Sequence, residues 1–396
     1  MESFSTIHTQ LHSLVIFRNL LSRRVIQQLD TLLCTDLSDV GAAVDAYSNF
    51  VSALFKHTED FSEYLLNFMV EDENIYMLQS CRTVQMSENM GTCLAHEVHF
   101  LQTLSTLSAA QVQAQIRYEG YLPGWNNTVY DFAGIYAQRI HDLPRKGYGM
   151  FARYHVFTIN NGSIVPVKHP DPQRIEELSG YELERNKVIN NTRALLKGQP
   201  ASNVLLYGDA GTGKSSTVKA IANEFADDGL RLIEVKKNQL YQIPDLVEKL
   251  SFNPLKFILF IDDLSFATND NDFAALKAIL EGSVGGRSDN LVVYATSNRR
   301  HLVKESLSDR EGDEIHLADT MQELMSLSAR FGLKVTFSRP DKELYCYIVQ
   351  NLAHAYGLDM DENMLMEQAE AHALRNGGRS PRVAKQFIEQ LRAAMR

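Results

Sequence analysis

The feature that most constrains this chain is a short apolar run followed at once by a glycine-rich loop. Residues 204–207 are apolar, and the loop that follows fits the pattern G-x-x-x-x-G-K-[ST] from Gly208 to Ser215. Residues 216–225 then place apolar side chains at helical spacing. The sequence therefore predicts a buried strand, a phosphate-binding loop and a helix, in that order.

The composition of this loop suits a triphosphate. Its glycines allow a tight turn with backbone N–H groups pointing inward, and the helix that follows directs its positive dipole end at the same anion. Lys214 is expected to reach the β- and γ-phosphates of ATP, and the Ser215 hydroxyl to ligate Mg²⁺. The expected nucleotide-binding residues are Gly208, Asp209, Ala210, Gly211, Thr212, Gly213, Lys214, Ser215 and Ser216.

Polar residues also follow two other expected strands, 256–261 and 291–296. Ligands of open parallel sheets bind at the carboxyl ends of the strands. Asp262 is expected to hold Mg²⁺ directly or through water, and Asp263 to orient or deprotonate the attacking water. Asn298 can hydrogen-bond the γ-phosphate or that water. A solvated acidic strand end and a turn-forming asparagine are the alternatives.

At 396 residues the chain has the length of two or three domains. We expect a mostly helical N-terminal domain at 1–150, a β-hairpin and linker at 151–172, an α/β core at 173–338 and a helical lid at 339–396. Helical periodicity in the first domain recurs in Leu11–Leu33, Val44–Phe55, Phe61–Val70 and Leu94–Leu107. Core strands are expected at 204–207, 230–235, 256–261, 291–296 and 333–337. Strands alternating with helices, such as one expected at 273–280, predict a doubly wound α/β sheet.

Composition narrows the classes of function. The formal net charge of −10 argues against a surface that binds nucleic acid throughout. No apolar run is long enough to span a bilayer and the N-terminus does not resemble a signal peptide, so the chain is expected to be cytoplasmic. A C-terminal basic cluster is interpreted as a solvated face, with nucleic-acid contact as the alternative; it comprises Arg375, Arg379, Arg382, Lys385, Arg392 and Arg396.

Other chemistry-bearing residues show no recognisable spacing. The cysteines are expected to be buried free thiols rather than disulfides or zinc ligands; they are Cys34, Cys81, Cys93 and Cys346. His96, Glu97 and His99 do not form H-E-x-x-H and are interpreted as ordinary helix-face residues. The single tryptophan, Trp125, is expected to pack within its own domain, with docking on a partner as the alternative.

From about Ile175 onward, the order of motifs resembles that of AAA+ ATPases. The matching segments are Leu178–Tyr181 before the core, Gly208–Ser215 as Walker A, Phe257–Asp263 as Walker B, Ala295–Arg299 as sensor 1, Ser328–Phe331 as an arginine-finger segment and Gly378–Val383 as sensor 2. Residues 229–235, 257–266 and 294–302 more narrowly resemble a bacterial AAA+ family catalogued only as a domain of unknown function.

This resemblance implies roles for two arginines. Arg330 would stabilise charge on the γ-phosphate in a neighbouring subunit, which requires a ring or filament of copies. Arg382 would sense the nucleotide from the lid, with Arg379 as its competitor. One position departs from the family: Asp263 stands where AAA+ proteins usually carry glutamate, and the shorter side chain places the acid farther from the water.

The favoured function is Mg²⁺-dependent ATP hydrolysis that couples motion between core and lid to the remodelling or regulation of a macromolecular partner. The acidic net charge favours a protein client over nucleic acid. A slow or non-hydrolysing ATP-dependent switch or scaffold is the alternative. A small-molecule P-loop kinase is a third hypothesis, against which Asn298 and the helical lid count.

Overall fold

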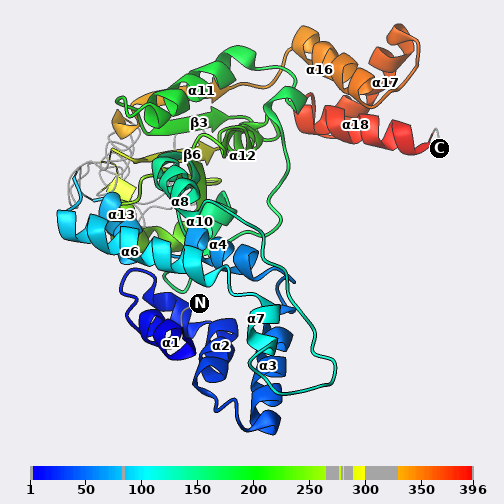
Figure 1. Cartoon of the computed structure of the whole chain (residues 1–396). Helices are drawn as coiled ribbons and strands as arrows, with labels where there is room; N and C mark the ends of the chain where they lie inside the picture. The colour runs from blue at the N-terminus through cyan, green and yellow to red at the C-terminus, as the bar shows by residue number, and fades with distance from the viewer. Residues whose placement is uncertain are drawn as a thin grey trace. The chain divides into compact units, whose positions relative to one another are not determined.

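The computed structural model describes residues 3–82, 85–264, 276–277, 280, 289–298 and 329–394. The chain forms two compact units, Met1–Ala152 and Arg153–Arg396 (Figure 1). The first unit is built from helices, and the second contains a mixed sheet and further helices. Among the described residues, no helix combines the length and apolarity needed to cross a membrane.

The described helices of the first unit range from 4 to 17 residues and bury a continuous apolar cluster. Trp125 belongs to it: the side chain is buried, the indole Nε1 donates to the Leu107 carbonyl at 2.9 Å, and the ring meets Phe50 edge-on. The predicted packing of Trp125 within its own domain is therefore confirmed. The elements are α1 (Phe4–His12), η1 (Arg18–Ser22), α2 (Arg24–Cys34), α3 (Val40–Leu54), α4 (Phe61–Glu71), α5 (Ile75–Ser80), α6 (Glu88–Leu104), α7 (Ala109–Gln113), α8 (Phe132–His141), α9 (Leu143–Lys146) and α10 (Met150–Arg153).

The helical periodicity predicted over Leu11–Leu33 is interrupted in the structure, because α1 ends at His12 and α2 begins at Arg24. Glu97, on α6, explains the interruption. Its buried carboxylate accepts hydrogen bonds of 2.7, 3.0 and 2.9 Å from the backbone N–H groups of residues 15–17. Backbone donors satisfied in this way do not need a helical partner. The interpretation of Glu97 as an ordinary helix-face residue is therefore wrong, since it fixes a turn about 80 residues earlier in the chain.

The cysteines also depart from expectation. All four are free, but Cys34 is exposed and the other three are only half-buried. The predicted burial of the thiols is therefore wrong. Cys34 stands at the C-terminal end of α2, where its side chain reaches the surface beside α1.

In the second unit, seven strands form one sheet in the order β2-β1-β4-β5-β6-β3-β7. Among the described strand pairs, only β1–β2 is antiparallel. The strands are β1 (Val156–Asn160), β2 (Ser163–Pro166), β3 (Val204–Gly208), β4 (Leu230–Glu234), β5 (Lys256–Ile261), β6 (Leu291–Ser297) and β7 (Leu333–Phe337). The α/β class and the five predicted core strands are confirmed.

The predicted hairpin forms, but it does more than link two domains. Strand β1 pairs in parallel with β4, with Val156 opposite Leu232, and so extends the sheet of the second unit. The side chains of Phe157 and Ile159 are buried on this extension. An alternating strand with one buried face gains stability by joining a sheet rather than standing alone.

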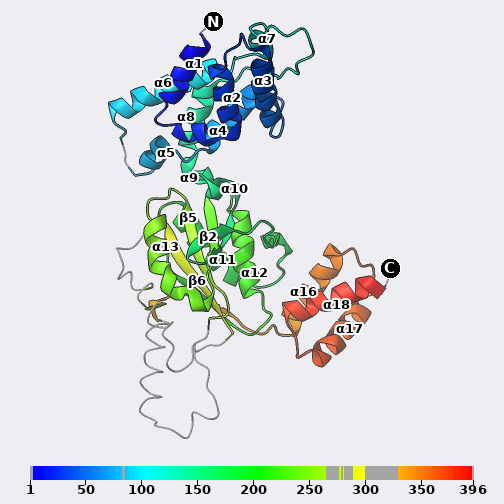
Figure 2. The same ribbon diagram turned by 90° about the horizontal axis from the view of Figure 1, so that it is seen from below.

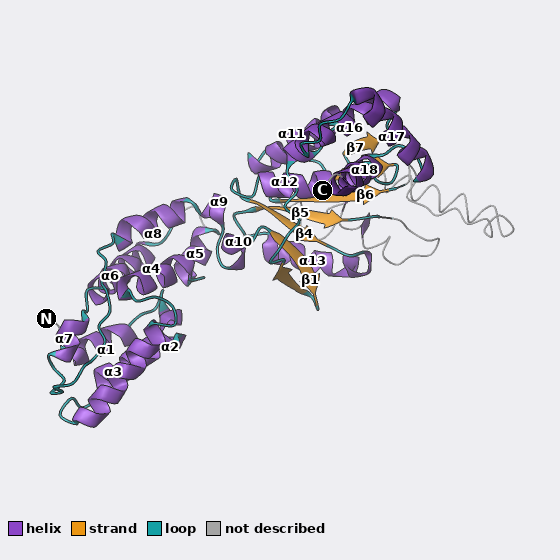
Figure 3. Ribbon diagram, turned by 90° about the vertical axis from the view of Figure 1, so that its right-hand side faces the viewer, coloured by secondary structure: helices purple, strands orange, loops and turns teal. Residues whose placement is uncertain are grey.

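Helices cover both faces of the sheet: α11 and α12 lie on one face and α13 on the other (Figure 3). Strand β5 is covered on both sides, and every residue of 257–261 is fully buried. The elements around the strands are η2 (Ile175–Glu177), α11 (Glu182–Leu196), α12 (Lys214–Glu224), η3 (Lys237–Gln242) and α13 (Ile243–Leu250). The helix predicted at 273–280 lies largely outside the described residues.

Three C-terminal helices, α16 (Lys342–Ala355), α17 (Glu362–Arg375) and α18 (Pro381–Ala394), gather into a small bundle (Figure 2). We call this bundle the lid. It meets the core at the end of β7, where the Tyr181 ring lies 5.3 Å from that of Phe337 and its hydroxyl donates to the Ser338 carbonyl at 2.6 Å. The segment that precedes the core in sequence therefore packs where core and lid join.

Candidate functional site

The loop after β3 has a backbone that requires glycine. Gly208 has φ 133°, and a Cβ there would lie 2.1 Å from the Phe337 carbonyl oxygen, so no other residue fits beside β7. Gly211 has φ 77°, and a Cβ there would lie 3.2 Å from Cβ of Arg382 and from Oγ of Ser380. The loop therefore turns tightly against both the sheet and the lid.

Lys214 occupies the interior of this loop. Its buried ammonium group donates to the carbonyls of Gly208 and Asp209, at 3.0 and 2.6 Å, and to Oδ1 of Asn298 at 3.0 Å. Burial lowers the pKa of Lys214, an effect opposed by the nearby carboxylates, with that of Asp209 first among them. The loop thus holds a positive charge where backbone N–H groups and a helix N-terminus also favour an anion.

Asp262 is the first residue after β5, and its carboxylate accepts hydrogen bonds from hydroxyl groups on two other elements. Its Oδ1 accepts hydrogen bonds of 2.6 Å from Ser215, at the start of α12, and 2.6 Å from Thr296, on β6. Asp262 is exposed. A carboxylate and a serine hydroxyl are hard oxygen ligands, so this pair fits Mg²⁺, which would there be able to neutralise phosphate charge.

Asp263 has the left-handed backbone conformation, with φ 52°. Its N–H donates to Thr296 Oγ1 at 2.9 Å, and its own Oδ1 accepts from Asn298 Nδ2 at 2.8 Å. Aspartate tolerates this conformation better than most residues with a Cβ. The turn after β5 is therefore fixed onto the end of β6.

The amide of Asn298 connects the two charged groups. Its oxygen accepts from Lys214 and its nitrogen donates to Asp263, so one neutral side chain links the phosphate-loop cation to the second acid. We call the connected group the sheet-edge network; its members are Lys214, Ser215, Asp262, Asp263, Thr296 and Asn298.

The two lid arginines considered from the sequence have different surroundings. Arg379 makes a bidentate pair with Glu370, with N–O distances of 2.9–3.1 Å, and is therefore engaged within the lid. Arg382 is exposed in the first turn of α18, and its backbone N–H donates to the Gly211 carbonyl at 3.2 Å. The structure brings Arg382, and not Arg379, to the phosphate loop.

Arg330 stands three residues before β7 and is half-buried. Its predicted action in a neighbouring subunit concerns a second copy of the chain, so it stays a prediction. Two residues of the predicted motifs, Arg299 and Ser328, lie outside the described residues.

Sequence reasoning assigned no role to two residues that contact this site. Thr296 connects Asp262 and Asp263 through its hydroxyl; the alternation of β6 could have indicated that its side chain faces the acids. Arg339 donates from its backbone to the Asp209 carboxylate at 2.9 Å and from its guanidinium to the Gly377 carbonyl. Its place at the junction of core and lid was the available signal.

The chain is similar in sequence to several known proteins. A family model described as "Protein of unknown function (DUF815)" matches residues 151–395. The chain is 27% identical over 224 residues to the Holliday junction branch migration complex subunit RuvB of Solibacter usitatus, covering 56% of this chain and 60% of that protein. It is 29% identical over 117 residues to the replication factor C large subunit of Staphylothermus marinus, covering 28% of this chain and 27% of that protein.

The chain thus spans less than two thirds of the curated relatives that it matches. Among solved structures, the Thermotoga maritima RuvB branch migration motor matches 56% of this chain and 65% of its own, with 17% identity and a TM-score of 0.38. The predicted resemblance is confirmed: the fold is an α/β P-loop fold of AAA+ type, preceded by a helical region.

Proposed function

We propose, from the premise that this chain belongs to the family of proteins of unknown function DUF815, that it binds and hydrolyses ATP with Mg²⁺. In this proposal the nucleotide cycle changes the contact between core and lid, and so acts on a macromolecular partner. The observation that carries the proposal is the sheet-edge network, in which Asn298 joins Lys214 to Asp263 beside the phosphate loop.

In this proposal each residue of the network has a part in the reaction. Backbone N–H groups of residues 208–216 and the Lys214 ammonium bind the phosphates. Ser215 and Asp262 hold the magnesium ion, and Asp263 positions the attacking water or accepts its proton. Asn298 orients that water or the γ-phosphate without adding charge.

The same hydrogen bonds supply a control on the reaction. Asn298 engages Lys214 and Asp263 at the same time. A γ-phosphate accepts hydrogen bonds, so it competes with the Asn298 oxygen for Lys214 and with Asp263 for the Asn298 Nδ2–H group. The second competition releases Asp263 toward the water. Hydrolysis therefore depends on a full triphosphate in the loop.

The lid contributes a second dependence on nucleotide. Because the Arg382 N–H binds the Gly211 carbonyl, the loop that binds phosphate also binds the lid. We propose that Arg382 contacts bound nucleotide and that Arg330 reaches the site of a neighbouring copy, so that the active form is a ring or filament. A change at the phosphates is then transmitted to α18 and to the neighbouring subunit.

The partner is proposed to be a protein, selected by the helical first unit, because the chain carries a net charge of −10. The names of two relatives, a replication factor subunit and a Holliday junction branch migration subunit, supply nucleic acid as the competing partner. Binding of nucleic acid would weaken steeply with added salt.

A slow or non-hydrolysing switch is the second candidate, and two features of Asp263 favour it. Asp263 is shorter than the usual glutamate, and a hydrogen bond of 2.8 Å to Asn298 engages its carboxylate. Both features reduce the population of an acid poised at the water. In this candidate, ATP binding and assembly carry the function, and turnover resets it slowly.

The deciding experiment measures steady-state ATP hydrolysis with Mg²⁺ over a range of protein concentrations. Asp263→Asn, Arg330→Ala and Arg382→Ala are compared with the wild type, and Arg375→Ala is the matched control because Arg375 is an exposed lid arginine at the end of α17. The ATPase proposal expects turnover per subunit to rise with concentration, and to fall at least about tenfold in the three variants while ATP binding persists in Asp263→Asn.

Wild-type binding of ATP with no turnover above that of Asp263→Asn would favour the switch. If turnover does not depend on protein concentration or on Arg330, the proposed action of Arg330 in a neighbouring subunit is contradicted. Turnover that rises with DNA or RNA, and loses this stimulation in salt, would replace the protein client with nucleic acid.

A further inference from the structure

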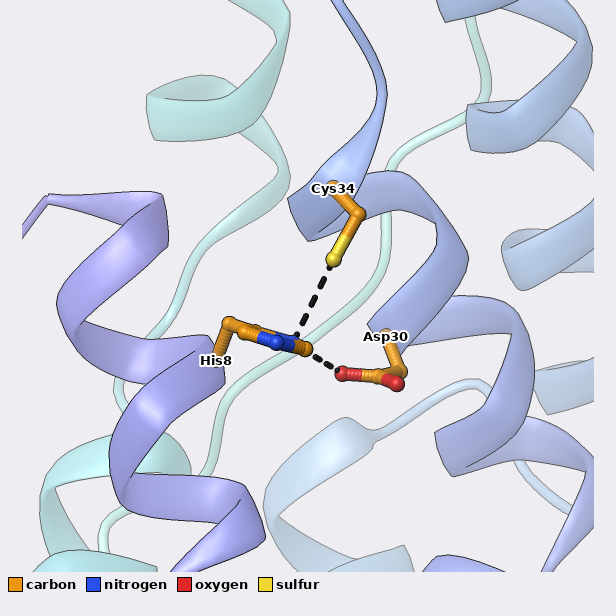
Figure 4. Close-up of side chains that lie close together, drawn as sticks. All are labelled: His8, Asp30 and Cys34. Carbon is orange, nitrogen blue, oxygen red and sulfur yellow. Dashed lines mark hydrogen bonds and ion pairs between the residues drawn. The ribbon is translucent and has the colours of Figure 1, made fainter.

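The first unit holds a second group of chemistry-bearing side chains, on the facing sides of α1 and α2 (Figure 4). His8 and His12 are four residues apart on α1, and Asp30 and Cys34 are four residues apart on α2. Residues at this spacing share one face of a helix. We call these residues the helix-pair cluster.

The atoms of this cluster that can bind a metal converge. His8 Nδ1 lies 2.7 Å from Asp30 Oδ1 and 3.3 Å from Cys34 Sγ. The ligand atoms of these three residues all lie within 4.8 Å of one another. His12 Nε2 lies 3.0 Å from the second oxygen, Asp30 Oδ2. The two helices thus bring a nitrogen, an oxygen and a sulfur ligand close together. His12 contacts the Asp30 oxygen that is not used in this group.

These distances suit a small tetrahedral ion. Bonds of about 2.0–2.3 Å from zinc to nitrogen, oxygen and sulfur place the ligand atoms roughly 3.3–3.8 Å apart. The His8–Cys34 distance of 3.3 Å already falls there, and the His8–Asp30 pair at 2.7 Å needs to separate by about half an ångström. His8 and Asp30 are half-buried and Cys34 is exposed, so an ion can enter from solvent with little rearrangement.

The ligand types select the class of metal. Thiolate and imidazole ligands favour zinc and related transition metals over Mg²⁺ and Ca²⁺, which prefer oxygen alone. One thiolate and one carboxylate also balance the charge of a divalent ion. By contrast, Ser215 and Asp262 in the second unit offer only oxygen.

We propose that His8, Asp30 and Cys34 form a site for a zinc-like divalent transition-metal ion that clamps α1 to α2, with His12 orienting the Asp30 carboxylate. Three protein ligands leave a fourth coordination position open to water or to a partner's side chain. Binding releases the thiol proton of Cys34 to solvent and changes no oxidation state. The site is independent of the nucleotide chemistry proposed above.

The test uses the full chain, reduced, with Co²⁺ as the probe, because only a thiolate ligand gives a sulfur-to-cobalt charge-transfer band. Wild type is expected to develop this band with about one equivalent of Co²⁺, and Zn²⁺ to displace it. Cys34→Ser is expected to lose the band, and His8→Ala to bind cobalt at least about a hundredfold more weakly. His12→Ala, which removes an orienting group, is expected to weaken binding by about tenfold.

Cys346→Ser is the matched control: that half-buried thiol lies in the lid, so the band is expected to remain. Asp262→Asn removes the carboxylate of the proposed magnesium pair in the second unit. This variant is also expected to retain the charge-transfer band. Circular dichroism checks that each variant is folded. The proposal is overturned if the wild type shows no charge-transfer band with excess Co²⁺, or if a folded Cys34→Ser keeps it.

Discussion

The sheet edge of the second unit and the interior of the first unit both place carboxylates among many polar partners, but the partners differ in kind. Asp262 and Asp263 are bonded mainly by hydroxyl and amide side chains, which can exchange one partner for another. Glu97 is bonded by three consecutive backbone N–H groups, which cannot move without unfolding the turn. The two exposed acids at the sheet edge thus have exchangeable side-chain partners, whereas the buried Glu97 has fixed backbone partners, and we associate the first arrangement with reaction and the second with structure.

The largest effect that would test this difference is expected from Lys214→Ala. Removing the cation from the phosphate loop is expected to lower kcat/KM for ATP by about a thousandfold, because nothing else in the described loop supplies a positive side chain. Trp125 fluorescence, which reports the first unit, is expected not to change. Lys219→Ala, on the same helix, is the control and is expected to retain activity.

Asn298→Ala is expected to have the next largest effect. It breaks the link between Lys214 and Asp263, so turnover is expected to fall by about a hundredfold while ATP affinity changes by only a few fold. Turnover and equilibrium binding of a fluorescent ATP analogue measure the two quantities separately. Equal losses in both would show that Asn298 serves binding rather than reaction.

In the first unit, Glu97→Gln is expected to reduce stability and leave ATP turnover unchanged. The amide replaces a charged acceptor of three N–H groups by a neutral one and turns a donor toward other donors, at a cost of about 2 kcal/mol. Urea unfolding followed by Trp125 fluorescence measures this cost. Glu88→Gln, at an exposed position on α6, is the control. An equal loss of unfolding free energy in this variant would show that the backbone hydrogen bonds of Glu97 have no special role.

The smallest effect is expected at Asp72, a buried acid in the same unit. Burial raises its pKa, and hydrogen bonds from Asn19 and Asn74 with the charge of Arg23 oppose this only in part. Oδ2 of Asp72 has no hydrogen-bond partner among the described residues. The native state therefore holds the proton more tightly than the unfolded state, whose pKa is near 3.8.

The sign of the pH dependence follows from this difference. The stability that protonated Asp72 contributes is present below the unfolded pKa and is lost as pH rises through the raised native value. Asp72→Asn is expected to stabilise the unit by about 1 kcal/mol at about pH 7.5 and by less at about pH 5. Urea unfolding at the two pH values measures the change in unfolding free energy. If the variant is less stable than the wild type at the higher pH, the raised pKa of Asp72 is contradicted.

The difference between the two units also explains which features the sequence could predict. The core strands are apolar runs bounded by polar turns, and the phosphate loop is one continuous segment, so both are visible locally. The placement of the two acids and Asn298 at one edge of the sheet was predictable because the carboxyl ends of parallel strands meet at the same edge. The proximity of Asp262 and Asn298 can therefore be predicted once their two strands are known to be parallel neighbours.

Features that depend on distant pairing were not predictable in this way. The turn after α1 depends on Glu97, about 80 residues later, and the hairpin joins the sheet through β4, which follows it by about 70 residues. The helix-pair cluster combines two helical repeats of four residues that no single motif contains. Each becomes visible only when two helices or strands are placed side by side.

The contact between α18 and the phosphate loop has a consequence for how this family can diversify. The hydrogen bond to Gly211 uses the backbone of Arg382, so docking is indifferent to the side chain at that position. If position 382 acts on nucleotide as proposed above, substitutions there change that response without undocking the lid. Gly211, whose missing side chain makes room for Arg382 and Ser380, is the position that must be spared.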